Sequence, residues 1–155
     1  MMRFRLLEEA LRFAISSSNR MFEAWVRAEL SKAFLGRGEL DRAEREAHTA
    51  VTVAHTKHCR YDEARAHLAL AHTQLRRGDA AALIRAEQAL VRAQGLIDAT
   101  GAHAHQPEVH ECRAHLSRLR GDAPTARQAI AEAQRLYAAM GATAQIERLT
   151  KDAGE

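Results

Sequence analysis

Aromatic residues make up only 5% of this 155-residue sequence, which also has just two prolines and two cysteines. β-Branched residues are sparse, whereas alanine, leucine, arginine and glutamate are abundant. The abundant residues favour helix at nearly every position, and the sparse ones are those that strands prefer. The composition therefore predicts an all-α protein and argues against a fold built on a sheet.

Three further absences narrow the class. Cys59 and Cys112 are far apart, and charges interrupt the first fifteen residues, which a secretory leader does not tolerate. No stretch approaches the roughly 20 uncharged apolar residues of a membrane-spanning helix. We therefore expect a cytoplasmic protein with reduced thiols and no membrane partner. The net charge of +3 arises from basic residues interleaved with acidic ones, which argues against nucleic acid as the main partner.

Internal repetition is the most informative feature present. Three matching turns, at 37–39, 77–79 and 120–122, each place glycine between a basic and an acidic residue. After each turn, apolar residues recur in steps of three and four, which places one apolar stripe on a helix face. The spacing predicts helices at about 3–16, 20–36, 40–56, 60–77, 80–98, 107–119, 123–140 and 142–152. The longest connection is then 99–106, and Pro107 and Pro124 each fall in a first helical turn.

The spacing of glycine and alanine resembles that of the tetratricopeptide repeat. In that family a turn glycine is followed by alanines five and twelve residues later, as in Gly38, Ala43 and Ala50 and again in Gly121, Ala126 and Ala133. The second unit departs from this pattern, because Gly78 is followed by Ala86 and Ala93. The long units look like the degenerate C-terminal repeats of bacterial signalling ATPases, cyclase-linked ATPases and helix-turn-helix transcription activators.

The resemblance implies a right-handed α-solenoid of antiparallel helix pairs, with about eight helices in one domain over 1–155. A partial repeat at 3–16 would precede repeats at about 20–56, 60–98 and 107–140, and a capping helix at 142–152 would follow. The function implied is that of a non-catalytic scaffold for protein–protein interaction, in a regulatory or sensory region of a larger bacterial signalling or transcription-regulating protein. The alternative is a helical repeat that binds nucleic acid or anions through arginines such as Arg65, Arg76 and Arg77.

In the resembling family, the first helix of each repeat lines a concave groove. Mapping by the turn glycines gives the candidate groove residues Trp25, Lys32, Leu35, Arg65, Leu68, His72 and Arg76, with Glu108, Glu111 and His115 as a looser third set. The basic members would suit an acidic peptide or a C-terminal carboxylate. Trp25 fits equally well as a ligand anchor and as a core residue.

Two histidine clusters invite a metal interpretation. His110 and His115 flank a glutamate in a near-match to the zincin motif, but they are five residues apart instead of the required four. His55, His58 and Cys59 can share a helix face but lack a further ligand. A metal held by His103, His105, His110 and Cys112 remains an alternative; the expectation is no metal, no cofactor and no catalytic residue.

The first predicted helix is apolar around most of its circumference. We expect Leu7, Leu11, Phe13 and Ile15 to form a patch that recruits a protein partner. Two explanations fit this surface: the chain is the tail of a longer protein, or the helix pairs with a second copy of the chain as a homodimer.

Overall fold

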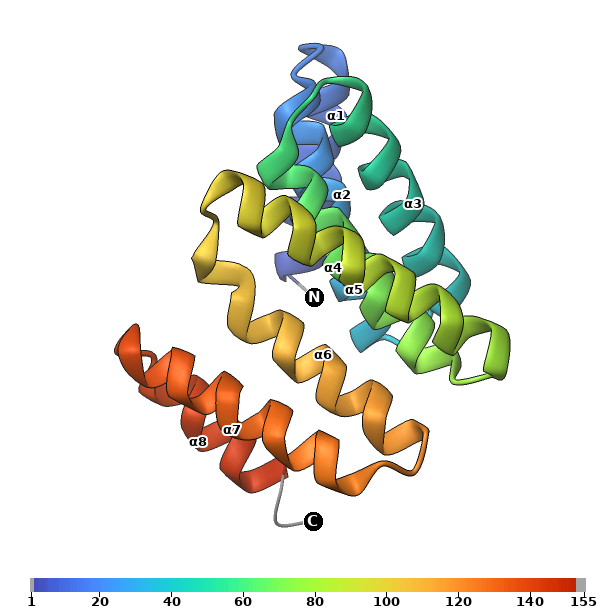
Figure 1. Cartoon of the computed structure of the whole chain (residues 1–155). Coiled ribbons are helices and arrows are strands. Elements are labelled where there is room, and N and C mark those ends of the chain that lie inside the picture. The colour runs from blue at the N-terminus through green and yellow to red at the C-terminus, as the bar shows by residue number, and fades with distance from the viewer. Residues whose placement is uncertain (1, 153–155) are drawn as a thin grey trace.

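The computed structural model describes residues 2–152, which form eight α-helices and one short 3₁₀ helix joined by tight turns (Figure 1). The elements, in chain order, are α1 (Met2–Ser16), α2 (Arg20–Gly36), α3 (Leu40–Thr56), α4 (Arg60–Arg77), α5 (Ala80–Thr100), η1 (His103–His105), α6 (Gln106–Leu119), α7 (Ala123–Ala139) and α8 (Thr143–Asp152). Within residues 2–152 there is no strand. The predicted all-α class with eight helices is confirmed.

The largest departure from the predicted bounds is at the end of α5. This helix continues to Thr100, whose hydroxyl donates a 2.7 Å hydrogen bond to the Leu96 carbonyl, and it ends at Gly101 with φ +70°. Ala99 and Thr100 carry no signal that would stop a helix, so the left-handed glycine sets the end. The predicted connection at 99–106 is correspondingly shorter and contains η1.

The three repeated turns share one backbone conformation. Gly38, Gly78 and Gly121 have φ values of +75°, +73° and +77°, a region that a side chain disfavours. The other four turns differ among themselves: Ser18 and His58 occupy the same region at φ +55°, whereas Gly101 and Gly141 occupy it at φ +70° and +69°. Glycine therefore marks every turn within a helix pair but only some of the turns between pairs.

The acidic residue after each glycine behaves differently from turn to turn. Asp79 accepts a 2.9 Å hydrogen bond from the Ala82 amide at the start of α5, and Asp122 does the same for Thr125 at the start of α7. Such caps satisfy amides that the helix itself leaves free. Glu39 makes no side-chain cap at α3.

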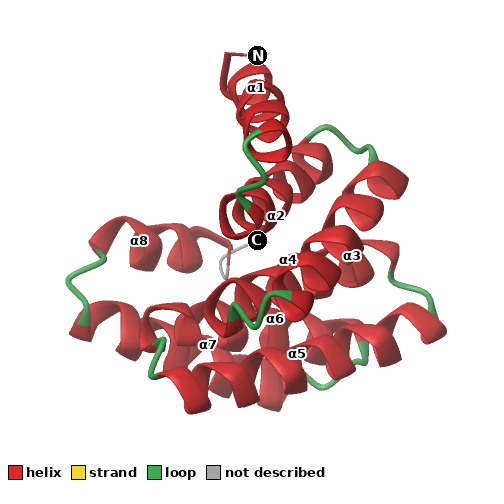
Figure 2. Ribbon diagram, turned by 90° about the horizontal axis from the view of Figure 1, so that it is seen from above, coloured by secondary structure: helices red, strands yellow, loops and turns green. Residues whose placement is uncertain are grey.

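The helices pack as successive antiparallel pairs along a curve. The pairs are α2 with α3, α4 with α5 and α6 with α7, and each is followed by contact with the next pair. In Figure 2, α2, α4 and α6 lie on the inner side of the curve and α3, α5 and α7 on the outer side. Inner helices contact each other from pair to pair, α2 with α4 and α4 with α6, as expected where a stack of helix pairs bends inward. This packing of consecutive helices is compatible with a helical repeat.

Small residues hold the pairs together. On α3 every buried residue is an alanine, namely Ala43, Ala47, Ala50 and Ala54. Part of this stripe meets Ala28, Ala66 and Ala69 of α2 and α4 in one buried cluster. Alanine lets two helix backbones approach closely. Larger side chains fill the core between α4, α5 and α6, among them Leu68, Leu90, Ile97 and Leu116.

Candidate binding face

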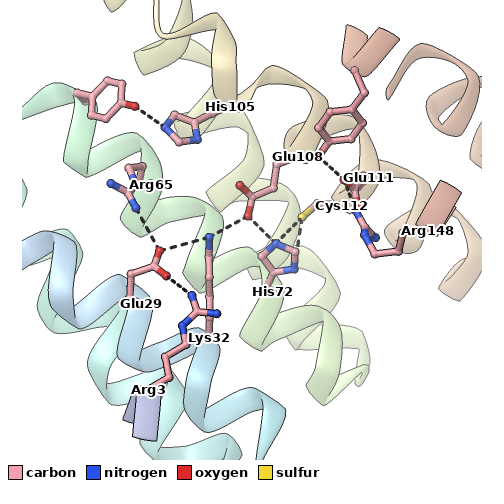
Figure 3. A network of polar contacts seen from close by, with 12 residues as sticks. Arg3, Glu29, Lys32, Arg65, His72, His105, Glu108, Glu111, Cys112 and Arg148 are labelled. Atoms are coloured by element: carbon pink, nitrogen blue, oxygen red, sulfur yellow. Dashed lines mark hydrogen bonds and ion pairs between the residues drawn. The ribbon is translucent and has the colours of Figure 1, made fainter. Parts of the chain in front are cut away.

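The solvent-facing side of α2, α4 and α6, which we call the inner face, carries most of the predicted groove residues. Lys32 projects from α2, Arg65 and His72 project from α4, and two carboxylates link them into one polar network (Figure 3). The sequence prediction missed one of these carboxylates, Glu29, and placed Glu108 only in a looser set.

Glu29 of α2 is the first centre of the network. Its carboxylate lies 3.1 Å from the Arg65 guanidinium of α4 and 3.3 Å from the Arg3 guanidinium of α1. The Lys32 ammonium, one helical turn further along α2, lies 3.9 Å away. A half-buried carboxylate with three cations around it is more than neutralised, so this part of the inner face carries a positive excess.

Glu108 of α6 is the second centre. It is 2.9 Å from Nε2 of His72 and 3.3 Å from Nζ of Lys32, so it ties α6 to both α4 and α2. Burial opposes its negative charge, but hydrogen bonds from His72 and Lys32 and their positive charges hold the pKa of Glu108 at about 2. The carboxylate is therefore ionised across the whole physiological range of pH.

His72 contacts both Glu108 and Cys112. The nearby Cys112 sulfur and the Glu108 carboxylate raise the pKa of His72 well above its ordinary value, against the effect of burial. The Cys112 sulfur lies 3.5 Å from Nε2 and 3.7 Å from Nδ1 of His72. The sulfur is therefore shared between the two ring nitrogens at distances typical of weak hydrogen bonds to sulfur. Cys112 is buried in the core beside Leu116, which fits the packing role expected for it.

Trp25 packs against the core, which is one of the two roles that the sequence left open; its role as a ligand anchor stays a prediction. Its ring stacks on Phe22 with centroids 5.5 Å apart and packs at the edge of the core between α1 and α2. The Arg65 guanidinium lies 5.7 Å from the centroid of the same ring, so Trp25 also supports a network cation. Tyr61 and His105 form a second aromatic contact nearby, joined by a 2.9 Å hydrogen bond (Figure 3).

A separate group of polar side chains joins α6 to α7 and α8. Glu111 receives two hydrogen bonds from Arg148, at 2.8 and 2.9 Å, and one from the Tyr137 hydroxyl at 2.5 Å. Burial and the neighbouring Glu111 carboxylate raise the pKa of Tyr137, which keeps its hydroxyl a donor. These contacts hold α8 against the end of the stack.

The remaining predicted groove residues differ in exposure. Leu68 is 1% exposed and belongs to the core between α4 and α5, so it is not available to a ligand in the groove. Leu35 is half-buried and packs on the core of α1 and α2. Arg76 is exposed at the end of α4. His115 lies half-buried on α6.

The predicted patch on α1 separates into two faces. Leu7 and Leu11 pack against α2, and Leu7 is only 8% exposed. Phe13 is 63% exposed and Ile15 49%, together with Leu6 at 58%, which the prediction did not include. Leu6 and Phe13 are seven residues apart and so share one side of the helix.

Within residues 2–152 the structure offers neither a cluster of metal ligands nor a helix that could span a membrane. Over this range no three potential metal-ligating side chains come together in a set that could hold an ion. His105 contacts Tyr61, and Cys112 contacts His72. Within the same range, every helix is too short or too polar to cross a bilayer. Comparisons of the chain with protein-family models and with curated proteins gave no match.

Proposed function

We propose that this protein is a non-catalytic scaffold for protein–protein interaction, and that its inner face binds a segment of a partner protein. The proposal includes the finer fold assignment, a right-handed α-solenoid of the tetratricopeptide type. The resemblance in glycine and alanine spacing also leads us to propose a regulatory role within a larger bacterial signalling or transcription-regulating protein.

The observation that carries the proposal is the charge of the inner face. Glu29 and Glu108 are surrounded by Arg3, Lys32 and Arg65, with His72 as a further cation because its pKa is raised. Arg3, Lys32 and Arg65 alone outnumber the two carboxylates, so the network keeps a positive excess, which a charged His72 increases. A partner segment rich in acidic residues would complement this face.

Trp25 provides a direct readout of binding, since it is the only tryptophan and lies under Arg65. A display library of 15-residue peptides would be selected on the immobilised protein, and the selected peptides titrated against Trp25 fluorescence. We expect acidic sequences to dominate, with micromolar affinity. Lys32→Glu should weaken their binding about tenfold or more, because it reverses the charge that lies between Glu29 and Glu108 at the centre of the network.

The matched control is Arg127→Glu, since Arg127 is exposed on the outer helix α7. If both variants weaken binding equally, net charge explains the effect and the inner face is not the site. Selection of no peptide, or of basic peptides only, would contradict the proposal.

We propose self-association through α1 as a second interaction, supported by the exposure of Leu6 and Phe13. Two apolar side chains on one side of a helix favour contact with the same stripe in a second copy. One helix pair buries less than a standard interface, so the dimer should be weak and visible only at high micromolar concentration.

Light scattering after size exclusion should then detect a dimer, and the double variant Leu6→Glu with Phe13→Glu should abolish it. Val91→Glu, at an equally exposed site on α5, should leave the dimer unchanged. A wild-type protein that is monomeric at every concentration would refute the self-association proposal.

A further inference from the structure

A pocket of about 220 Å³ lies where α4, α6, α7 and α8 meet, beyond the Glu108 end of the network. Two apolar side chains form part of its wall, Ile130 of α7 and Leu149 of α8. The rest of the lining is polar or titratable and consists of His72, Glu111, Cys112, His115, Arg118, Arg148 and Asp152. An apolar wall beside several cations strengthens their attraction for an anion.

Some of the charges at this pocket are already neutralised. Arg148 is held by Glu111 at 2.8 Å and is 3.7 Å from Asp152. His72 is held by Glu108 at 2.9 Å. Arg148 and His72 are therefore already paired with carboxylates of the protein.

Two arginines near the pocket have no such neutralisation. Arg76 at the end of α4 and Arg118 at the end of α6 are both exposed. Within residues 2–152 neither approaches a carboxylate to 4 Å. By contrast Arg77, next in sequence to Arg76, is held by Asp41 at 2.6 Å and by Glu44 at 2.7 Å.

His115 lines the pocket together with Arg118, which lies one turn further along α6. Burial lowers its pKa, and the positive charges of His72, Arg118 and Arg76 lower it further. Burial and these charges favour the neutral imidazole, and the two carboxylates of the pocket, Glu111 and Asp152, are both paired with Arg148. A helix C-terminus attracts cations, which explains the arginines at the ends of α4 and α6 but not the half-buried histidine that shares the pocket with Arg118.

We propose that Arg76, His115 and Arg118 form a binding site for a doubly charged oxyanion, a phosphate monoester carried by the partner segment. The two guanidinium groups supply several donors that match the oxygens of a phosphate, and one imidazole N–H supplies another. Because His115 and Arg118 line the pocket, it would receive the phosphate group itself. The identity of the carrier rests on the proposed scaffold function, whereas the anion site itself does not.

Inorganic phosphate tests the site without any partner. The imidazole signals of the protein would be followed by NMR during titration with phosphate and, separately, with chloride at equal ionic strength. We expect the His115 signal to shift with phosphate and to saturate in the millimolar range. Arg76→Ala and Arg118→Ala should each weaken binding about tenfold, while Arg127→Ala on α7 should not. A response no larger with phosphate than with chloride would overturn the proposal, as would equal weakening by the control.

A second readout distinguishes a bound anion from general screening. An anion bound beside His115 favours the charged imidazole, so saturating phosphate should raise the pKa of His115, whereas screening by chloride should change it little. The charged and titratable groups facing this ring are His72 and Arg76 from α4, Glu111 and Arg118 from α6, and Arg148 and Asp152 from α8. An unchanged pKa of His115 in phosphate would contradict direct contact.

The carrier is tested with three ligands of equal length: a selected peptide with phosphoserine at one position, the same peptide with serine, and a single-stranded oligonucleotide. We expect at least tenfold preference for the phosphopeptide over the serine peptide, abolished by Arg118→Ala. Phosphate binding without this preference, or tighter binding of the oligonucleotide, overturns the assignment to a protein partner. If peptides bind but phosphate does not, the anion site is wrong while the scaffold function stands.

Discussion

Replacing Glu108 with glutamine is the sharpest test of the network on the inner face. The carboxylate pairs with Lys32 and His72, and its side chain is 22% exposed. Its pKa falls from 4.5 to about 2 in the folded protein. That difference corresponds to about 3 kcal/mol of stability at neutral pH, which solvent screening of a partly exposed group reduces to about 2 kcal/mol.

The assay is urea unfolding at pH 7, followed by the helical circular dichroism signal. Glu108→Gln should lower the free energy of unfolding by about 2 kcal/mol, equivalent to a fall of roughly 4–8 °C in Tm for a chain of this size. Glu147→Gln on α8 is the matched control, because Glu147 is exposed and pairs with no cation within residues 2–152. A loss below about 0.5 kcal/mol, or an equal loss in the control, would refute the reasoning.

The pH dependence of the stability provides a second test of this prediction. Folding lowers the pKa of Glu108, so its contribution is complete above about pH 4.5 and is lost as the pH falls toward 2. Folding raises the pKa of His72, so that contribution is present below pH 6.5 and is lost as the pH rises through the folded value. The stability difference between wild type and Glu108→Gln should therefore be largest at about pH 5–6 and shrink on both sides. A difference that grows toward pH 2 would contradict the assigned direction.

Two further predictions concern backbone and packing, and both are measured by urea unfolding. Gly121→Ala should lower the free energy of unfolding by about 1–2 kcal/mol, because Gly121 has φ +77°. Gly95→Ala should raise it by up to about 1 kcal/mol, because Gly95 lies inside α5 and the added methyl has no atom within 4 Å. A change of the same sign in both variants would contradict the conformational argument. Ala93→Leu should lower the free energy of unfolding by about 1–3 kcal/mol, because Ala93 is fully buried where α5 meets its neighbours. Ala99→Leu, at an exposed position of the same helix, should change it by less than about 0.5 kcal/mol.

The helices could be predicted from the sequence because local signals determine them. A glycine such as Gly78 fixes a turn through its own backbone, and the apolar steps that follow it belong to a single helix. The end of α5 was predicted two residues early, since Ala99 and Thr100 are compatible with either helix or loop. Ser18 and His58 were not identified as left-handed, because side chains other than glycine rarely adopt that region and carry no signature for it.

The polar network could be predicted only in part, for a geometric reason. Counting from the turn glycines placed Lys32, Arg65 and His72 on one face, and the structure links these three through shared carboxylates. The same count placed Leu68 there, but its side chain is 1% exposed and packs in the core with α5 and α6. Arg3 could not be assigned, because its distance from Glu29 depends on how α1 crosses α2.

Lys32 can turn from the carboxylates of the network to a carboxylate of a bound partner. It is shared between Glu29 and Glu108, and it is 38% exposed. Glu29 retains two arginines, and Glu108 retains His72, when Lys32 turns to another anion. Neither carboxylate is then left as an unpaired charge, which is the costly outcome for a group of limited exposure. Binding of an acidic segment can therefore draw on Lys32 at small cost to the fold. The carboxylates that tie α2, α4 and α6 together would stay in place, and the inner face would keep its shape while its charge is satisfied.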